Sequence, residues 1–129
     1  MTIVDASLVA DALRSTNSPA QLALTSAAGP LAAPELVDLE VASAYRKLVA
    51  AGALTPDDGR ELLERLRVLP LDRHPHRPLL SRVWSLRSQL SAYDAAYVAL
   101  AEQLGGTLIT RDDGFAKVAG IKCAVTVIA

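Results

Sequence analysis

The sequence predicts an α/β fold in which helices cover both faces of a small, mainly parallel sheet. Short runs of β-branched and apolar residues alternate along the chain with longer segments of helical periodicity. Strands that alternate with helices in this way favour a parallel sheet with a layer of helices on each side. Of the residues, 51% are hydrophobic but only 4% are aromatic, so we expect a core of mainly Ala, Leu and Val. At 129 residues the chain is long enough for one domain with a single core.

The N-terminal half predicts one strand followed by helices. The strand is TIV at residues 2–4, and it ends at Asp5. Helix boundaries are indicated by an N-cap such as Thr55, by proline in the first turn and by glycine after the last turn. With apolar periodicity, these signals predict helices over residues 7–14, 19–28 and 34–51, and over a segment that begins at Pro56.

The C-terminal half predicts three further strands, which are VLPL at residues 68–71, TLIT at 107–110 and CAVTVIA at 123–129. The segment DRHPHRP, at 72–78, is expected to be an exposed loop, and its two histidines lack the further ligands that a zinc site needs. Helical patterns cover residues 78–89, the segment from the expected N-cap Ser91 to Gly105, and, as a short helix or turn, residues 114–120.

Acidic residues stand at the ends of several of these elements. Asp5 follows the first strand and Asp112 follows TLIT, and ligands of an open parallel sheet bind at the carboxyl ends of its strands. Asp94 lies in the first turn of the helix that leads into TLIT, and Glu40 stands among apolar residues inside a helix. Taken singly, Asp94 is explained as a capping residue and Asp112 as a turn residue. Glu40 alone is explained as an edge position of its helix.

The four acids considered together suggest a different role from the one that each suggests alone. If they converge, their mutual repulsion raises their pKa values unless a cation neutralises them. Carboxylate oxygens favour Mg²⁺ or Mn²⁺ over Zn²⁺. The pattern therefore indicates a divalent metal site as a hypothesis.

Four segments carry a resemblance to a known family. They are VDAS at residues 4–7, PELVDLEV at 34–41, SAYDAAYVALAE at 91–102 and LITRDD at 108–113. In this order and at these spacings the chain resembles the PIN-domain ribonucleases and, within them, the VapC-type toxins of bacterial toxin–antitoxin pairs. The resemblance covers nearly the whole chain. It implies a PIN-like three-layer α/β/α sandwich, with residues 1–129 forming a single PIN domain.

The resemblance also implies a site and an activity. The metal-binding acids of the family fall on Asp5, Glu40, Asp94 and Asp112. Thr110, in the T-x-D form, is an expected auxiliary group. Asp113 leaves a choice open, because it could add a second ligand, replace Asp112 or begin the next turn. Members of the family hydrolyse RNA phosphodiester bonds with Mg²⁺ or Mn²⁺, so an endoribonuclease toxin is implied.

Partners are implied by the resemblance alone. They are an RNA substrate, a cognate VapB-type antitoxin whose tail enters the active-site groove, and a second copy of the chain in a homodimer. The alternative is a degenerate PIN-fold module that binds a protein or nucleic acid without cleaving it. A phosphoacceptor receiver domain is disfavoured, because no adjacent pair of acids follows the first strand.

Side chains that could contact RNA are harder to choose. The net charge is -1, so binding would depend on a local basic surface. Arg14, Arg111 and Lys117 are the candidates for phosphate contacts. Among the aromatic residues, Tyr93 is the candidate for a substrate contact. The others are expected to pack within helices, and they are Tyr45, Trp84 and Tyr97.

The remaining signals concern the compartment. Cys123 is the single cysteine and cannot form an intrachain disulfide, which favours a reducing compartment. Its neighbours are apolar, so a buried, unreactive thiol is expected. The N-terminus lacks the pattern of a signal peptide, and no apolar run is long enough to span a bilayer. We therefore expect a cytoplasmic protein without a membrane partner.

Overall fold

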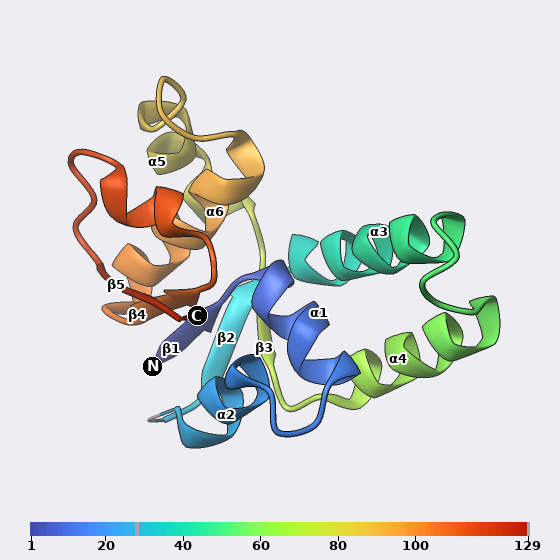
Figure 1. The fold of residues 1–129 in the computed structure, drawn as a ribbon. Coiled ribbons are helices and arrows are strands. Elements are labelled where there is room, and N and C mark those ends of the chain that lie inside the picture. Colours follow the sequence, from blue (N-terminus) through green and yellow to red (C-terminus); the bar gives the residue numbers. More distant parts are fainter. Residues whose placement is uncertain (28, 129) are drawn as a thin grey trace.

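The computed structural model describes residues 1–27 and 29–128, and these residues contain a five-stranded, all-parallel sheet (Figure 1). The strands stand in the order β3-β2-β1-β4-β5, and every neighbouring pair is parallel. They are β1 (Thr2–Val4), β2 (Leu31–Pro34), β3 (Asp72–His74), β4 (Thr107–Thr110) and β5 (Ala124–Val127). The predicted α/β fold with a parallel sheet is confirmed.

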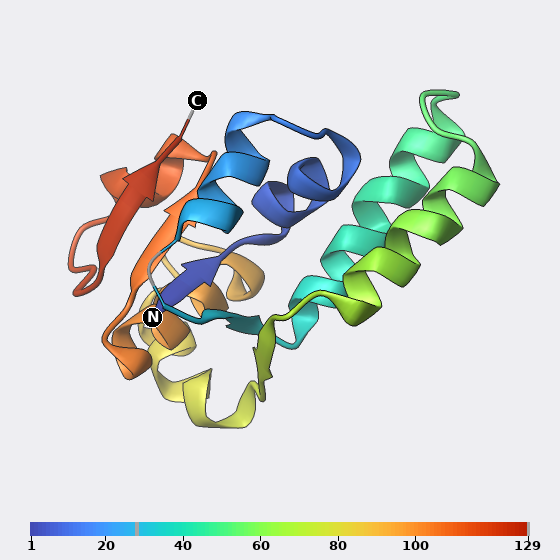
Figure 2. The same cartoon turned by 90° about the horizontal axis from the view of Figure 1, so that it is seen from below.

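Helices cover both faces of this sheet. The α-helices are α1 (Ala6–Arg14), α2 (Pro19–Ser26), α3 (Leu36–Ala50), α4 (Pro56–Val68), α5 (Leu80–Ser85) and α6 (Ala92–Leu104). Two short 3₁₀ segments are η1 (Arg77–Leu79) and η2 (Asp113–Lys117). Helices α5 and α6 lie on one side of the sheet and α1 and α2 on the other, while α3 and α4 form a hairpin that extends away from it (Figures 1 and 2).

The core lies where α6 and α1 press against the central strands. Every residue of α6 from Ala95 to Leu100 is buried, and so are Leu8 and Val9 of α1 and Ile3 and Val4 of β1. Alanines on α6 allow its backbone to approach the sheet closely. Gly106 matters for the same reason, because a Cβ there would stand 2.6 Å from Ile3 Cδ1 and 2.7 Å from Met1 O. A side chain at this position would push β4 away from β1.

The predicted N-caps are confirmed. Thr55 Oγ1 accepts a hydrogen bond from Asp58 N at 3.1 Å, and Ser91 Oγ accepts one from Asp94 N at 3.1 Å. Gly105 ends α6 with φ of 64°, the left-handed conformation that glycine adopts most easily. Local signals therefore predicted the start of α4 and both ends of α6 correctly.

Strand β2 was missed by the sequence analysis. Its residues, LAAP, combine two alanines with a proline, which is a weak strand signal. Pro34 was expected in the first turn of a helix over 34–51, but it ends β2 beside His74 of β3. The helix begins two positions later, at Leu36. The strand forms because tertiary pairing with β1 overrides the local preference.

The predicted strand at residues 68–71 is wrong. Val68 is the last residue of α4 and is 65% exposed, whereas the strand β3 lies at Asp72–His74. The segment expected to be an exposed loop thus supplies an edge strand. Only Leu71 of the predicted strand is buried. The prediction relied on the apolar residues of VLPL alone, and it placed the strand a few residues too early.

Other boundaries moved by smaller amounts. The helix predicted over 78–89 is the short η1 and α5, followed by turns. The last strand and the turn before it are confirmed as β5 and η2. Predicted ends at residues 28 and 129 lie outside the described residues.

Within the described part of the chain, no helix is both long and apolar enough to cross a membrane.

Candidate metal centre

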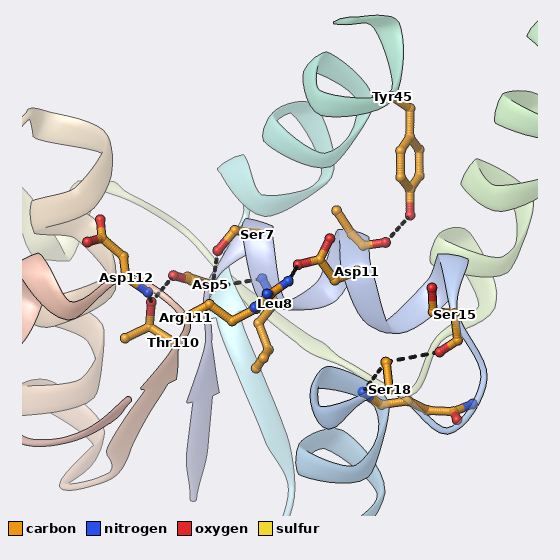
Figure 3. A network of polar contacts seen from close by, with 12 residues as sticks. Asp5, Ser7, Leu8, Asp11, Ser15, Ser18, Tyr45, Thr110, Arg111 and Asp112 are labelled. Carbon is orange, nitrogen blue, oxygen red and sulfur yellow. Dashed lines mark hydrogen bonds and ion pairs between the residues drawn. The ribbon is translucent and has the colours of Figure 1, made fainter. Parts of the chain in front are cut away.

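The carboxyl ends of β1 and β4 bring Asp5 and the T-x-D segment together. Because the two strands are parallel neighbours, both end at the same edge of the sheet. Thr110, fully buried at the end of β4, donates its hydroxyl to Asp5 Oδ2, and Asp112 N donates to Thr110 Oγ1 at 2.9 Å (Figure 3). One hydroxyl therefore connects residues that are more than 100 positions apart.

Asp5 also opens α1. Its Oδ1 accepts hydrogen bonds from Leu8 N at 3.0 Å and from Ser7 Oγ at 3.1 Å (Figure 3). The carboxylate thus serves as the N-cap of the helix. It is 6% exposed, and donors on both of its oxygens fix its orientation.

Glu40 and Asp94 are connected through α6. Tyr97 on α6 donates its hydroxyl to Glu40 Oε1 on α3 at 2.7 Å. Asp94 lies three positions before Tyr97, and this spacing puts both side chains on one face of the helix. Both acids are half-buried.

The acids influence one another electrostatically. Burial raises the pKa of Asp5, hydrogen bonds from Thr110, Leu8 and Ser7 offset part of the rise, and the charge of Asp112 adds to it. Burial also raises the pKa of Asp94, and the charges of Asp112 and Asp5 raise it further. The pKa of Glu40 is raised by burial and by the charges of Asp94 and Asp5, against the Tyr97 hydrogen bond that lowers it. Asp5, Glu40, Asp94 and Asp112 therefore form one electrostatic cluster.

None of these four acids forms an ion pair with a described residue. Six other acids do pair with Arg or Lys, and they are Asp11, Asp38, Glu61, Glu64, Glu102 and Asp113. A buried carboxylate without a countercharge is costly. In this cluster a bound cation would therefore offset the cost of burying the carboxylates and the repulsion between them.

The chemistry of these side chains fits a divalent ion, although the described residues do not form a complete coordination site. Carboxylate and hydroxyl oxygens are the ligands that Mg²⁺ and Mn²⁺ prefer. Across residues 1–27 and 29–128, however, no group of three or more His, Cys, Asp or Glu side chains is arranged to hold an ion as it stands. Several oxygens are taken by protein donors, such as Asp112 Oδ1 by Gly114 N at 2.8 Å. Ion binding would require side-chain adjustment at the more exposed acids.

The other predicted residues make contacts outside the four acids: Asp113, Lys117 and Arg111 form ion pairs, and Arg14 lines a groove. Asp113 begins η2 and pairs with Lys117 at 3.6 Å, with both side chains 75% exposed. Arg111 pairs with Asp11 of α1 (Figure 3). Arg14 lines a groove of about 610 Å³ between α1 and α3, together with Ser7, Glu40 and Lys47.

The sequence analysis did not choose Tyr97 or Lys47 as residues of the site. Tyr97 was assigned to packing, which its burial confirms, but its hydroxyl was not connected with Glu40. Its helical spacing from Asp94 was the available signal. Tyr45 is buried as predicted, whereas Trp84 is 68% exposed, so the packing prediction is wrong for that residue. Tyr93, the candidate for a substrate contact, is 65% exposed beside Asp94.

Comparisons with known proteins identify the family. A model of the PIN domain matches residues 2–121. The chain is 41% identical to Ribonuclease VapC9 of Mycobacterium tuberculosis over 128 residues, which covers 99% of this chain and 98% of that protein. The chain belongs to the PIN-domain family, among the VapC ribonuclease toxins. It is also 34% identical to Ribonuclease VapC1 of the same species, over 98% of this chain and 96% of that protein.

Solved PIN-fold structures agree with the architecture. A toxin–antitoxin complex from Klebsiella pneumoniae matches with a TM-score of 0.72 and 22% identity, over 98% of this chain and 97% of that chain. The sarcin–ricin loop cleaving toxin VapC20 of Mycobacterium tuberculosis matches with a TM-score of 0.70 and 16% identity, over 94% and 96% of the two chains. At these identities the likeness concerns the fold. Ribonucleases of this family are typically metal-dependent.

Proposed function

We propose that this VapC ribonuclease toxin is an endoribonuclease that uses Mg²⁺ or Mn²⁺ held by Asp5, Glu40, Asp94 and Asp112. The observation that carries the proposal is the set of four neighbouring acids without a cationic partner among the described residues. The raised pKa values of Asp5, Glu40 and Asp94 support it, because desolvation and neighbouring negative charges act together there.

Each residue has a role that follows from its position. When bound, the ion would supply Lewis-acid stabilisation of the charge that develops on the phosphate oxygens. Asp5 is the fixed ligand, because donors on both oxygens hold it in place. Thr110 orients Asp5 and connects it to the backbone of Asp112. Glu40, Asp94 and the exposed Asp112 complete the set from three separate segments.

Asp112 is the proposed ligand in preference to Asp113. The charge of Asp112 acts on Asp5 and Asp94, and its backbone amide is bonded to Thr110. Asp113 opens η2 and already has a cationic partner in Lys117. These contacts support the T-x-D interpretation, with Asp113 beginning the next turn.

RNA phosphates need cations beside this acidic cluster. Arg14 and Lys47 line the α1–α3 groove that also contains Glu40, and neither forms an ion pair with a described residue. We assign them phosphate contacts. Arg111 and Lys117 remain candidates, but each would first have to break its ion pair, with Asp11 and Asp113 respectively.

The proposed partners are RNA, a VapB-type antitoxin and a second copy of the chain. Solved relatives include toxin–antitoxin complexes, and an acidic cluster suits a basic side chain from an inhibitor. We further propose that residues 1–129 act as one PIN domain and that the toxin works in the cytoplasm, where its RNA substrates are.

The test is RNA cleavage by the purified protein with matched variants. Wild type should cleave RNA in Mg²⁺ or Mn²⁺ and lose this activity in EDTA. Asp112→Asn should lower the rate by about 100-fold or more, since a metal contributes several kcal/mol of charge stabilisation. Asp113→Asn removes the neighbouring acid, and we expect its rate to stay within about twofold of wild type, because an exposed ion pair contributes little.

Three results would contradict the proposal or part of it. Cleavage that persists at full rate in EDTA would exclude the metal site. Binding of RNA without cleavage, under every metal condition, would favour the alternative of a degenerate PIN-fold binding module. An equal loss in the Asp113 variant would show that the ligand assignment within the T-x-D segment is wrong.

A further inference from the structure

The hydrogen bond between Tyr97 and Glu40 joins two parts of the site, helix α6 and helix α3. Glu40 lies on α3, whose hairpin with α4 extends away from the sheet (Figures 1 and 2). Tyr97 lies on α6, which packs on the sheet and also carries Asp94. The hydroxyl to Oε1 distance is 2.7 Å, and the two residues are 57 positions apart.

The environment of Tyr97 makes this contact specific. The residue is 1% exposed, so its ring is fixed by packing and its hydroxyl has little freedom to find water. A buried phenol that loses its partner leaves an unsatisfied donor. The hydroxyl therefore has a strong preference for Glu40, and Glu40 is held in one orientation.

A tyrosine suits this position chemically. A Lys or Arg at the same place would neutralise Glu40 and compete with a metal ion for its charge. A phenol donates a hydrogen bond but adds no charge, so the carboxylate remains a ligand. The bond also uses only one carboxylate oxygen, Oε1. Outer partners of this kind orient ligands in many metal sites.

We propose that Tyr97 is a positioning residue that holds Glu40 ready to bind the divalent ion. The proposal rests on the proposed function, since it requires that Glu40 is a ligand. Tyr97 itself does not touch the ion or the RNA. Its effect should appear in metal affinity and, through that affinity, in cleavage at limiting metal.

The chain offers a matched control in Tyr45. This residue lies on α3 with Glu40, is 2% exposed, and donates its hydroxyl to Ala10 O at 2.8 Å. Tyr45→Phe and Tyr97→Phe therefore delete the same atom from equally buried tyrosines. Only Tyr97→Phe removes a partner from a site acid.

The experiment measures Mn²⁺ binding to the full-length, ion-free protein by isothermal titration calorimetry. Tyr97→Phe should raise the dissociation constant about tenfold, the lower end of the usual effect of an outer-shell partner. Tyr45→Phe should leave it within about twofold of wild type, because its hydroxyl contacts no ligand. Cleavage by Tyr97→Phe should recover toward wild type when Mn²⁺ is raised by the same factor. Thermal unfolding in EDTA gives the stability of each variant separately.

The possible failures are distinguishable. If wild type binds Mn²⁺ and cleaves RNA but Tyr97→Phe has the same affinity as wild type, the positioning role is overturned and the proposed function survives. A lower unfolding temperature with unchanged Mn²⁺ affinity overturns it as well, since the hydroxyl would then be purely structural. If wild type neither binds Mn²⁺ nor cleaves RNA, both proposals fail.

Discussion

Asp5, Glu40 and Asp94 are buried or half-buried acids that the fold does not neutralise. Burial is the first cause of the raised pKa of each, and neighbouring acids add to it. At the residue scale, the negative charges of these side chains destabilise the ion-free folded protein. Their presence is explained if the protein gives up stability in the ion-free state to gain a binding site.

This explanation gives a pH dependence with a definite sign. The pKa values of Asp5 and Asp94 are raised above 3.8 and that of Glu40 above 4.5 in the folded protein. The folded protein therefore keeps protons that the unfolded chain has lost. These acids make the ion-free protein less stable as the pH rises above their ordinary values, until the raised folded pKa values are passed.

Asp94→Asn tests this sign. The amide removes the charge and keeps the shape, so we expect the ion-free variant to unfold at a temperature higher than wild type at pH 7, on the order of 2 °C. The difference should shrink toward pH 4. Thermal unfolding in EDTA measures it, with the exposed, paired Asp113→Asn as control. A lower unfolding temperature for Asp94→Asn at pH 7 would show that the charge of Asp94 does not destabilise the ion-free protein.

Single residues were predicted with mixed success, for physical reasons. Asp5 and Asp112 could be chosen because they follow strands, and the structure places the Thr110 hydroxyl between them. The partner of Tyr97 could not be chosen, because an interhelix contact depends on how α3 and α6 pack. The ion pair of Arg111 with Asp11 was missed for the same reason.

At the scale of elements, the position of α3 depends on a histidine from elsewhere in the chain. Glu35 is the N-cap residue of α3, but its side chain makes no capping hydrogen bond. His76 Nε2 instead accepts from Leu36 N at 3.0 Å, and Glu35 N donates to His74 O at 2.9 Å. The last residue of β3 and the segment after it thus hold the start of the helix that carries Glu40.

We predict that His76→Ala destabilises the protein by about 0.5–2 kcal/mol, the range for the loss of an N-cap acceptor. Urea unfolding at neutral pH measures the loss. His74→Ala is the matched control, because the Glu35 contact uses the backbone oxygen of His74. Equal stability of wild type and His76→Ala, or a larger loss for His74→Ala, would contradict the capping role.

The sequence predicted elements where local signals were strong. Caps and glycine stops identified α4 and α6, and apolar β-branched runs identified β1 and β4. It failed at β2 and β3, whose residues LAAP and DRH have weak strand preferences. These strands exist because the paired neighbours in the sheet supply the hydrogen bonds, which is a tertiary effect that local patterns do not contain.

At the scale of the whole molecule, the parallel sheet explains why distant acids can meet. Strands β1 and β4 are adjacent although most of the chain separates them. Helix α6, which leads into β4, packs against the central strands β1, β2 and β4. The order of strands therefore brings Asp5 and Asp112 to one edge. Helix α6 brings Asp94 and, through Tyr97, Glu40.

The central claim is that these four acids bind one kind of ligand, a divalent ion. The direct measurement is anomalous diffraction at the manganese absorption edge from crystals soaked in Mn²⁺. We predict that the strongest anomalous peak lies among the carboxylates of Asp5, Glu40, Asp94 and Asp112. A strongest peak at His74 and His76 or at an exposed acid, or the absence of any peak at the four carboxylates, would contradict the account.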